Sequence, residues 1–270
     1  MGVDRDMAKS VELAHGEYCW LMSSDDILAR GAIELILNKI TSRDEIYLCD
    51  IFHCDSDMIP WSRSHFIKKS HKTNKFNISK KKEFLDYMDL ATSNNALFCY
   101  MCSMIFLRKK WMNTEFNELM DNSGYAHVYS LFSFRKTGCT INYISTPLVL
   151  NRTENDSFSG GGIEKRYLID FDGYFLLANL LFSEEPEIKQ IFLSLMTKEH
   201  KWYRLVKLRL AIKSTKKWDE LTIKLLQFGY RPSTLKICGY IGRLNFIVNI
   251  ALLLNTNLKK VHKIFFNFQN

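Results

Sequence analysis

Two adjacent carboxylates, Asp25 and Asp26, end the segment SSDD at 23–26, directly after a short aromatic and apolar run at 17–22. Like charges this close repel each other, and a hard divalent cation relieves that cost because Mg²⁺ and Mn²⁺ prefer carboxylate oxygens and commonly bridge to phosphates. The run EYCWLM predicts a buried strand, and ligands of open parallel sheets bind beyond the carboxyl ends of their strands. We therefore expect Asp25 and Asp26 to bind Mg²⁺ or Mn²⁺. The alternative is that Ser24 or Asp25 only caps the next helix.

The residues around this segment predict an α/β domain. Apolar residues at helical spacing indicate one helix over 4–14, with Asp4 as its N-cap, and another over 31–40. The apolar run IYLCDIF at 46–52 predicts the next strand. Helix, strand, acidic turn, helix and strand in this order predict a mostly parallel sheet with helical crossovers.

The rest of the chain continues this alternation and then becomes helical. Residues 55–82 are polar and basic, which predicts an insertion or mobile loop outside the core. From Ile163 on we expect helices with turns near 184–186, 229–232 and 255. Between these regions we expect helices at 83–90 and 125–136, strands at 97–107 and 140–144, an extended piece at 147–150, and a polar loop at 151–162.

A family resemblance is carried by the segment AHGEYCWLMSSDD at 14–26 and by ILARGA at 27–32. It resembles the A-x-G-E-Y…D-D…G-A segment of family 2 glycosyltransferases, in particular the abequosyltransferase-like branch of O-antigen synthesis enzymes. The stretch GVDRDM at 2–7 is similar to the same branch, and more diffuse similarity runs to about residue 180.

The resemblance implies a GT-A fold, which is a Rossmann-like α/β fold. It implies a nucleotide-sugar-dependent, hexosyltransferase-type enzyme of O-antigen or surface polysaccharide synthesis. The donor sugar would be a dideoxyhexose and the acceptor a lipid-linked saccharide. In this pattern Asp26 and Asp25 match the metal motif, with Asp25 and Ser24 also at the donor. The metal would stabilise the departing diphosphate.

Two parts of the family pattern have no match in this sequence, and the first is the part that binds the nucleobase. The family begins with a strand–helix–strand unit that holds the nucleobase, and this sequence matches the pattern only after that unit. We therefore expect a partial, N-terminally truncated GT-A-like core at 1–155 and a helical, basic region at 156–270. The alternative function is a non-catalytic remnant that binds a membrane or a partner subunit.

The second part without a match is the carboxylate that serves as general base in the family. Many relatives carry a Glu-Asp pair at the start of the helix after the acceptor loop, and here that position falls near Ala126-His127. His127 is the first candidate because imidazole titrates near neutral pH, and Asp121 is the rival. The alternative is that His127 only packs or caps the helix.

Arg152 precedes a glycine run at 160–162. Backbone amides of such a run and a guanidinium group suit a phosphate, so Arg152 joins the donor-binding candidates. A plain flexible connection is the alternative.

Composition excludes several classes of protein. The chain has 270 residues, of which 47% are hydrophobic and 24% charged, so wholesale disorder and fibrous folds are out. Seven cysteines, an odd number, lie mostly in apolar strings, which predicts reduced thiols and a cytoplasmic protein. The CxxC at 99–102 has no second pair, so we expect no zinc site there.

Charge is concentrated at the C-terminal end. From Lys198 on, 15 Lys and Arg stand against 3 Asp and Glu, while the whole chain carries +8. The apolar run at 244–254 is too short to span a bilayer. We expect a peripheral region at the cytoplasmic face of the inner membrane, or else an ordinary helical subdomain with a solvated basic face. No recognition motif supports nucleic acid as a partner.

Overall fold

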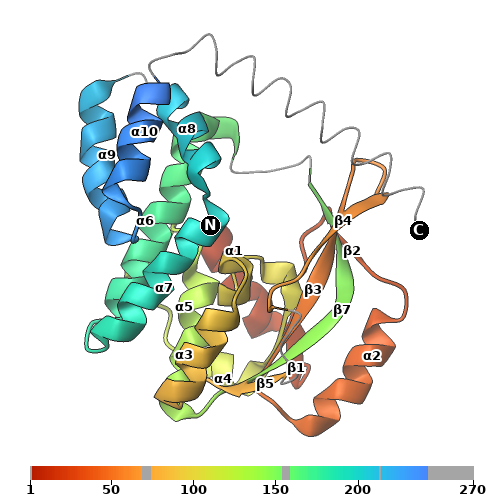
Figure 1. Cartoon of the computed structure of the whole chain (residues 1–270). Helices are drawn as coiled ribbons and strands as arrows, with labels where there is room; N and C mark the ends of the chain where they lie inside the picture. The colour runs from red at the N-terminus through yellow and green to blue at the C-terminus, as the bar shows by residue number, and fades with distance from the viewer. Residues whose placement is uncertain (1, 69–73, 154–158, 213, 243–270) are drawn as a thin grey trace.

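The computed structural model of the protein describes residues 2–68, 74–153, 159–212 and 214–242. One curled sheet lies on one side of the molecule, and most helices gather on the other side (Figure 1). Within these ranges no helix has the length and apolar character that crossing a membrane requires. Residues 243–270, which include the apolar run at 244–254 and the last lysines of the region for which we expect a membrane surface, lie outside the described residues.

The sheet is mixed, so the expectation of a mostly parallel sheet is wrong. Its order is β1-β6-β3-β7-β2, with β4 paired to β3 and β5 paired to β7. Within the described ranges, β3 and β7 form the only parallel pair. Short loops such as the one between β3 and β4 reverse the chain, and a parallel neighbour needs a longer crossover. The strands are β1 (Tyr18–Trp20), β2 (Ile27–Leu28), β3 (Ile46–Cys54), β4 (Pro60–Ser64), β5 (Lys75–Asn77), β6 (Met104–Leu107) and β7 (Thr140–Arg152).

Strand β3 confirms the strand expected at 46–52. Its residues 46–51 are all buried, as is typical of a central strand that is covered on both faces. The pairing of β3 with β7 shifts around Asp50, where Pro147 lies opposite, because proline donates no ladder hydrogen bond and is found at bulges. Asp50 is fully buried, and its carboxylate accepts hydrogen bonds from Tyr143 and from the backbone amide of Phe66.

The expectation that 55–82 lies outside the core is wrong for the part that the structure describes. The segment contributes β4 and β5 to the sheet, and Phe66, Phe76 and Ile78 are buried. The sequence argument gave weight to the many polar and basic residues of this segment. The lysines that the structure describes in this segment are exposed, while the apolar residues between them pack inward.

The helices expected before residue 140 are present. The N-cap of the first helix and the extent of the strand expected at 97–107 differ from the expectation. Gly2, not Asp4, is the N-cap of the first helix. Asp4 is buried and accepts hydrogen bonds from the backbone amides of Gly124 and Ala126, 2.8 and 3.0 Å away. Only 104–107 of the strand expected at 97–107 is extended, since 3₁₀ turns occupy 94–97 and 101–103. The expected helices are α1 (Val3–Leu13), α2 (Ala32–Lys39), α3 (Lys81–Leu90) and α5 (Ala126–Ser133), and the short α4 (Arg108–Met112) is not among them.

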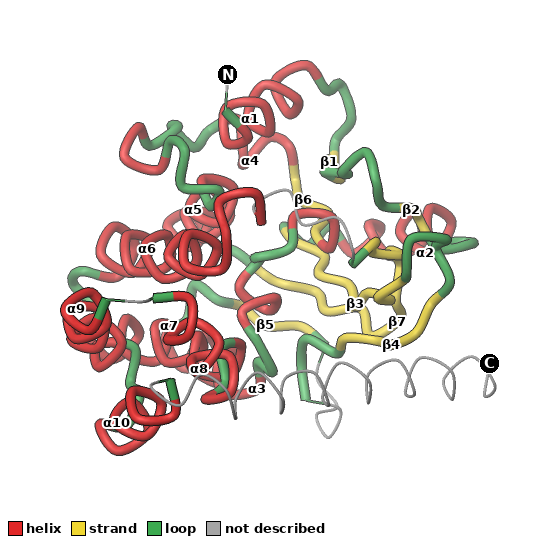
Figure 2. Tube along the Cα trace, turned by 90° about the horizontal axis from the view of Figure 1, so that it is seen from above, coloured by secondary structure: helices red, strands yellow, loops and turns green. Residues whose placement is uncertain are grey.

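The helical region expected after residue 163 is confirmed as far as the structure describes it. Aromatic rings join it to the rest of the core: Phe132 on α5 contacts rings of Phe182 and Phe192, with centroids 6.1 and 5.7 Å away. Figure 2 shows these helices beside the sheet rather than apart from it. The domain boundary at 155 stays a prediction. The helices are α6 (Gly162–Phe182), α7 (Pro186–Glu199), α8 (Trp202–Ala211), α9 (Thr215–Gln227) and α10 (Pro232–Ile241).

Candidate functional site

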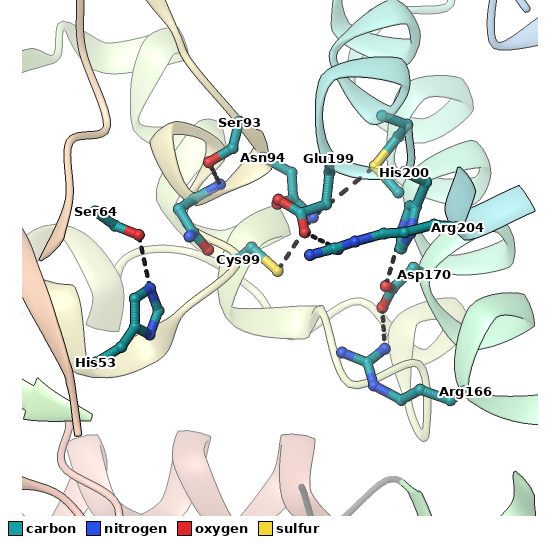
Figure 3. Close-up of polar contacts among 12 residues, drawn as sticks. His53, Ser64, Ser93, Asn94, Cys99, Arg166, Asp170, Glu199, His200 and Arg204 are labelled. Carbon is teal, nitrogen blue, oxygen red and sulfur yellow. Dashed lines mark hydrogen bonds and ion pairs between the residues drawn. The ribbon is translucent and has the colours of Figure 1, made fainter. Parts of the chain in front are cut away.

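A cavity of about 580 Å³ lies between the acidic segment after β1 and the helices α6–α8. This volume is within the usual range of small-molecule sites. One wall consists of the acidic segment, with Ser23, Asp25 and Asp26. The opposite wall, which we call the helical wall, is made by polar residues of α6 and of the α7–α8 corner (Figure 3). Its members are Arg166, Tyr167, Asp170, Glu199, His200 and Arg204.

The carboxylate of Asp26 joins the acidic segment to two other parts of the fold. Its Oδ2 accepts hydrogen bonds from Ser23 Oγ at 2.6 Å, from Cys102 Sγ at 3.3 Å and from the Tyr100 hydroxyl. Its Oδ1 accepts from Asn151 Nδ2 at 3.2 Å and from the backbone amide of Arg152 at 3.0 Å. The carboxylate thus holds the end of β7 next to the turn that follows β1.

The protonation states around Asp26 follow from this network. Burial favours a higher pKa for Asp26, but the hydrogen bonds from Ser23 and Tyr100 outweigh it and hold the pKa below 3.8. Burial raises the pKa of Cys102 to about 11 and also raises that of Tyr100. At neutral pH the tyrosine and the thiol therefore keep their protons and donate them to an ionised Asp26.

Asp25 converges on the same hydroxyl group. Its Oδ1 lies 2.6 Å from Ser23 Oγ, which also contacts Asp26. A serine hydroxyl has one hydrogen, so it cannot donate to both carboxylates at once. Two anionic groups thus approach one donor at the edge of the cavity.

The serine in this network is Ser23 rather than Ser24. Ser24 is exposed and is not among the residues that line the cavity. The alternative that Ser24 or Asp25 caps the next helix is wrong, because β2 intervenes and Gly31 is the N-cap of α2 without a capping side chain.

The oxygen donors of this wall fit a hard divalent cation. Carboxylates are the protein ligands that Mg²⁺ and Mn²⁺ prefer, and the carboxylates of Asp25 and Asp26 meet at one shared hydroxyl at the edge of the cavity. Three or more His, Cys, Asp or Glu side chains do not gather around one point anywhere in the described ranges. A cation held here would therefore complete its shell with water or with the oxygens of a bound phosphate.

Arg152 lies at the cavity, as expected for a donor-binding candidate. Its backbone binds Asp26, and its Nε lies 3.3 Å from Met58 Sδ. The glycine run forms a 3₁₀ turn at 159–161 and the first residue of α6. Most of the loop between them, 154–158, lies outside the described residues.

The two candidates for the general base differ in position. His127 lines the cavity and is 3% exposed, and its Nε2 donates to the carbonyl of Phe98 at 2.9 Å. Burial lowers its pKa to about 4 although this hydrogen bond raises it. The ring is therefore neutral at pH 7 and a weak proton acceptor. Asp121 does not line the cavity, and its carboxylate pairs with Arg5 Nε at 2.7 Å.

Sequence reasoning missed the helical wall. Asp170, 4% exposed, binds His200 Nε2 at 3.0 Å and also pairs with Arg166 and Tyr125. The signal in the sequence is weak: Arg166 and Asp170 are four residues apart, the spacing of helical ion pairs, in a helix with several other charged residues. His53 also lines the cavity, where it binds Ser64 Oγ at 2.7 Å.

The sequence is similar to that of a curated glycosyltransferase. The abequosyltransferase RfbV of Salmonella typhimurium is 34% identical over 205 residues, which are 75% of this chain. The matched part spans 61% of that relative's length. No family model matches the chain.

Replacing Asp26 by asparagine should lower the stability of the fold. The amide nitrogen of asparagine would face hydrogen-bond donors, and the remaining bonds would lose their charge. We expect Asp26→Asn to reduce the free energy of unfolding by about 2–3 kcal/mol, as measured by urea denaturation. Asp86→Asn, which changes an exposed carboxylate on α3, is the matched control. Equal stability of the two variants would contradict the role given to Asp26.

His127 should make the protein sensitive to mild acid. Its pKa is about 4 in the folded chain and 6.5 in an ordinary environment. Between these values the unfolded state binds more protons, so stability falls as pH is lowered from about 6.5 to about 4, by up to about 3 kcal/mol. His127→Gln should remove this part of the acid sensitivity in urea denaturation at pH 7 and pH 4. His15→Gln, at an exposed position, should not. If the free energy of unfolding falls by the same amount between pH 7 and pH 4 in the parent and in His127→Gln, His127 is not a buried neutral group.

Proposed function

We propose that this chain acts as a glycosyltransferase of O-antigen or surface polysaccharide synthesis. It would move a sugar from a nucleotide-sugar donor to a saccharide acceptor. The observation that carries the proposal is the similarity to abequosyltransferase RfbV together with the place of the acidic segment. Asp25 and Asp26, which carry the family resemblance, line the cavity. A family 2 assignment, a GT-A fold and a dideoxyhexose as the donor sugar belong to the same proposal.

The charges of the cavity support a divalent cation at Asp25 and Asp26. Its lining has four carboxylates, those of Asp25, Asp26, Asp170 and Glu199, against three arginines. A site with one net negative charge repels the diphosphate of a nucleotide sugar. When bound, Mg²⁺ or Mn²⁺ would reverse that charge and stabilise the departing diphosphate as a Lewis acid.

The protein's own groups take the other parts of the reaction. Arg152 would contact a phosphate at the end of β7, where its backbone is fixed by Asp26. Of the two base candidates, His127 lines the cavity and Asp121 does not. We therefore retain His127 as the group that would accept the proton of the acceptor hydroxyl.

The place of action that we propose is the cytoplasmic face of the inner membrane, where a lipid-linked acceptor would lie. Supporting this are the excess of basic residues after Lys198 and the aromatic side chains of Trp202 and Tyr240, which are 57% and 66% exposed. Basic and aromatic side chains together suit an anionic lipid surface.

Removing one carboxylate of the acidic segment should abolish transfer. We expect the parent chain, given Mn²⁺, nucleotide sugars and a bacterial lipid-linked saccharide extract, to release nucleoside diphosphate. Asp25→Asn should reduce this release by about 10²-fold or more, since it removes charge from the proposed cation site. Asp86→Asn should retain the parent's rate. Equal rates for all three proteins would refute the metal assignment. A folded parent chain without any turnover would instead favour the non-catalytic remnant.

A further inference from the structure

The helical wall differs in charge from the acidic segment opposite. Arg166 pairs with Asp170, and Arg204 pairs with Glu199. Two guanidinium groups are thus matched by two carboxylates, and these four side chains carry no net charge. A wall that binds phosphate needs positive charge that is not already neutralised. The pairing therefore argues against a second diphosphate site on this wall.

The same wall is dense in hydrogen-bonding groups that reach the cavity. A guanidinium group has five N–H donors, and a carboxylate has about four acceptor positions. The side chains of Arg204 and Glu199 are 39% and 22% exposed, and both line the cavity. Figure 3 shows the pair between Cys99 and Asp170, with the amide of Asn94 close by. The pair thus presents donors and acceptors together.

The wall is held in place from behind. Burial favours a higher pKa for Asp170, but the hydrogen bond from His200 and the charge of Arg166 outweigh it, so the pKa is lowered and the group stays ionised. The ring of His200 packs against Tyr167 and Phe171, with centroids 4.9 and 5.1 Å away. Groups fixed in this way lose little freedom when a ligand binds.

Two imidazoles at this cavity have a nitrogen without a partner. Both His127 and His200 are at least 96% buried and line the cavity, and Nδ1 of each has no hydrogen-bond partner among the described residues. In each ring Nε2 faces an acceptor, the carbonyl of Phe98 or the carboxylate of Asp170. The two Nδ1 atoms are themselves buried, so the two rings shape the cavity, and hydrogen bonds to a ligand fall to the partly exposed side chains of the wall.

We propose that the helical wall binds the acceptor saccharide, with Arg204 and Glu199 as the residues that select its hydroxyl pattern. Paired charges, many donors and acceptors, and the ring of Tyr167 suit a neutral ligand with many hydroxyls. A site built to bind hydroxyl groups discriminates strongly against ligands that lack them. The inference rests on the proposed function, since it names the second substrate of the same cavity.

The test separates saccharide binding from nucleotide binding. The probes are the methyl glycosides of glucose, galactose, mannose and rhamnose. Their binding is measured by saturation-transfer NMR, with and without Mn²⁺ and one of the nucleotides CDP, UDP or GDP. We expect at least one glycoside to bind the parent at about millimolar Kd. Arg204→Gln and Glu199→Gln should each weaken the affinity for that glycoside about tenfold or more. Their affinity for the nucleotide should stay unchanged, which also shows that the variants are folded. Lys201→Gln, which removes a charge next to the wall, should bind like the parent.

Three results would overturn the inference. Nucleotide binding by a parent that binds none of the glycosides would refute the saccharide site and leave the proposed function standing. Loss of nucleotide affinity in Arg204→Gln, with glycoside binding intact, would assign the wall to the donor. Equal glycoside affinity in all variants would place the saccharide elsewhere. Absence of nucleotide binding in the parent, by contrast, counts against the proposed function.

Discussion

The carboxylate of Asp26 is the constraint on which the rest of the site depends. It accepts hydrogen bonds from the turn after β1, from the 100–102 turn and from the end of β7. These segments are far apart in the sequence, and their positions are set by one charge. Each donor lowers the cost of keeping that charge partly buried, and the charge in turn fixes each donor. Asp25 and Arg152 owe their places at the cavity to this arrangement.

The cavity is a joint product of the sheet and the helices. Aromatic packing of Phe132 with Phe182 and Phe192 brings α6 and α7 against α5. The corner between α7 and α8 then brings His200 and Arg204 to the cavity opposite the acidic segment. The C-terminal helices therefore contribute directly to the site, in addition to any role at a surface. One wall carries two adjacent carboxylates and the other carries matched ion pairs, which suits two chemically different ligands.

Much of this could be predicted from local pattern, and some could not. The strand at 46–52 and the helices after 163 follow from apolar periodicity. Asp25 and Asp26 line a cavity, but the strand before them, β1, is a short, half-buried edge strand that pairs antiparallel with β6, so the expectation of a buried strand there is wrong. The antiparallel pairings could not be found, because strand direction depends on contacts between distant segments. The pair Asp170–His200 joins α6 to the turn between α7 and α8, 30 positions away in the sequence. No local spacing encodes such a contact.

The most direct test of the account is calorimetric titration of the full chain with CDP, UDP and GDP, each with and without Mn²⁺. We predict that one nucleotide binds only when Mn²⁺ is present, because the carboxylates of the cavity otherwise repel the diphosphate. Metal-independent binding, or no binding by a chain that circular dichroism shows to be folded, would contradict a metal-assisted donor site at Asp25 and Asp26.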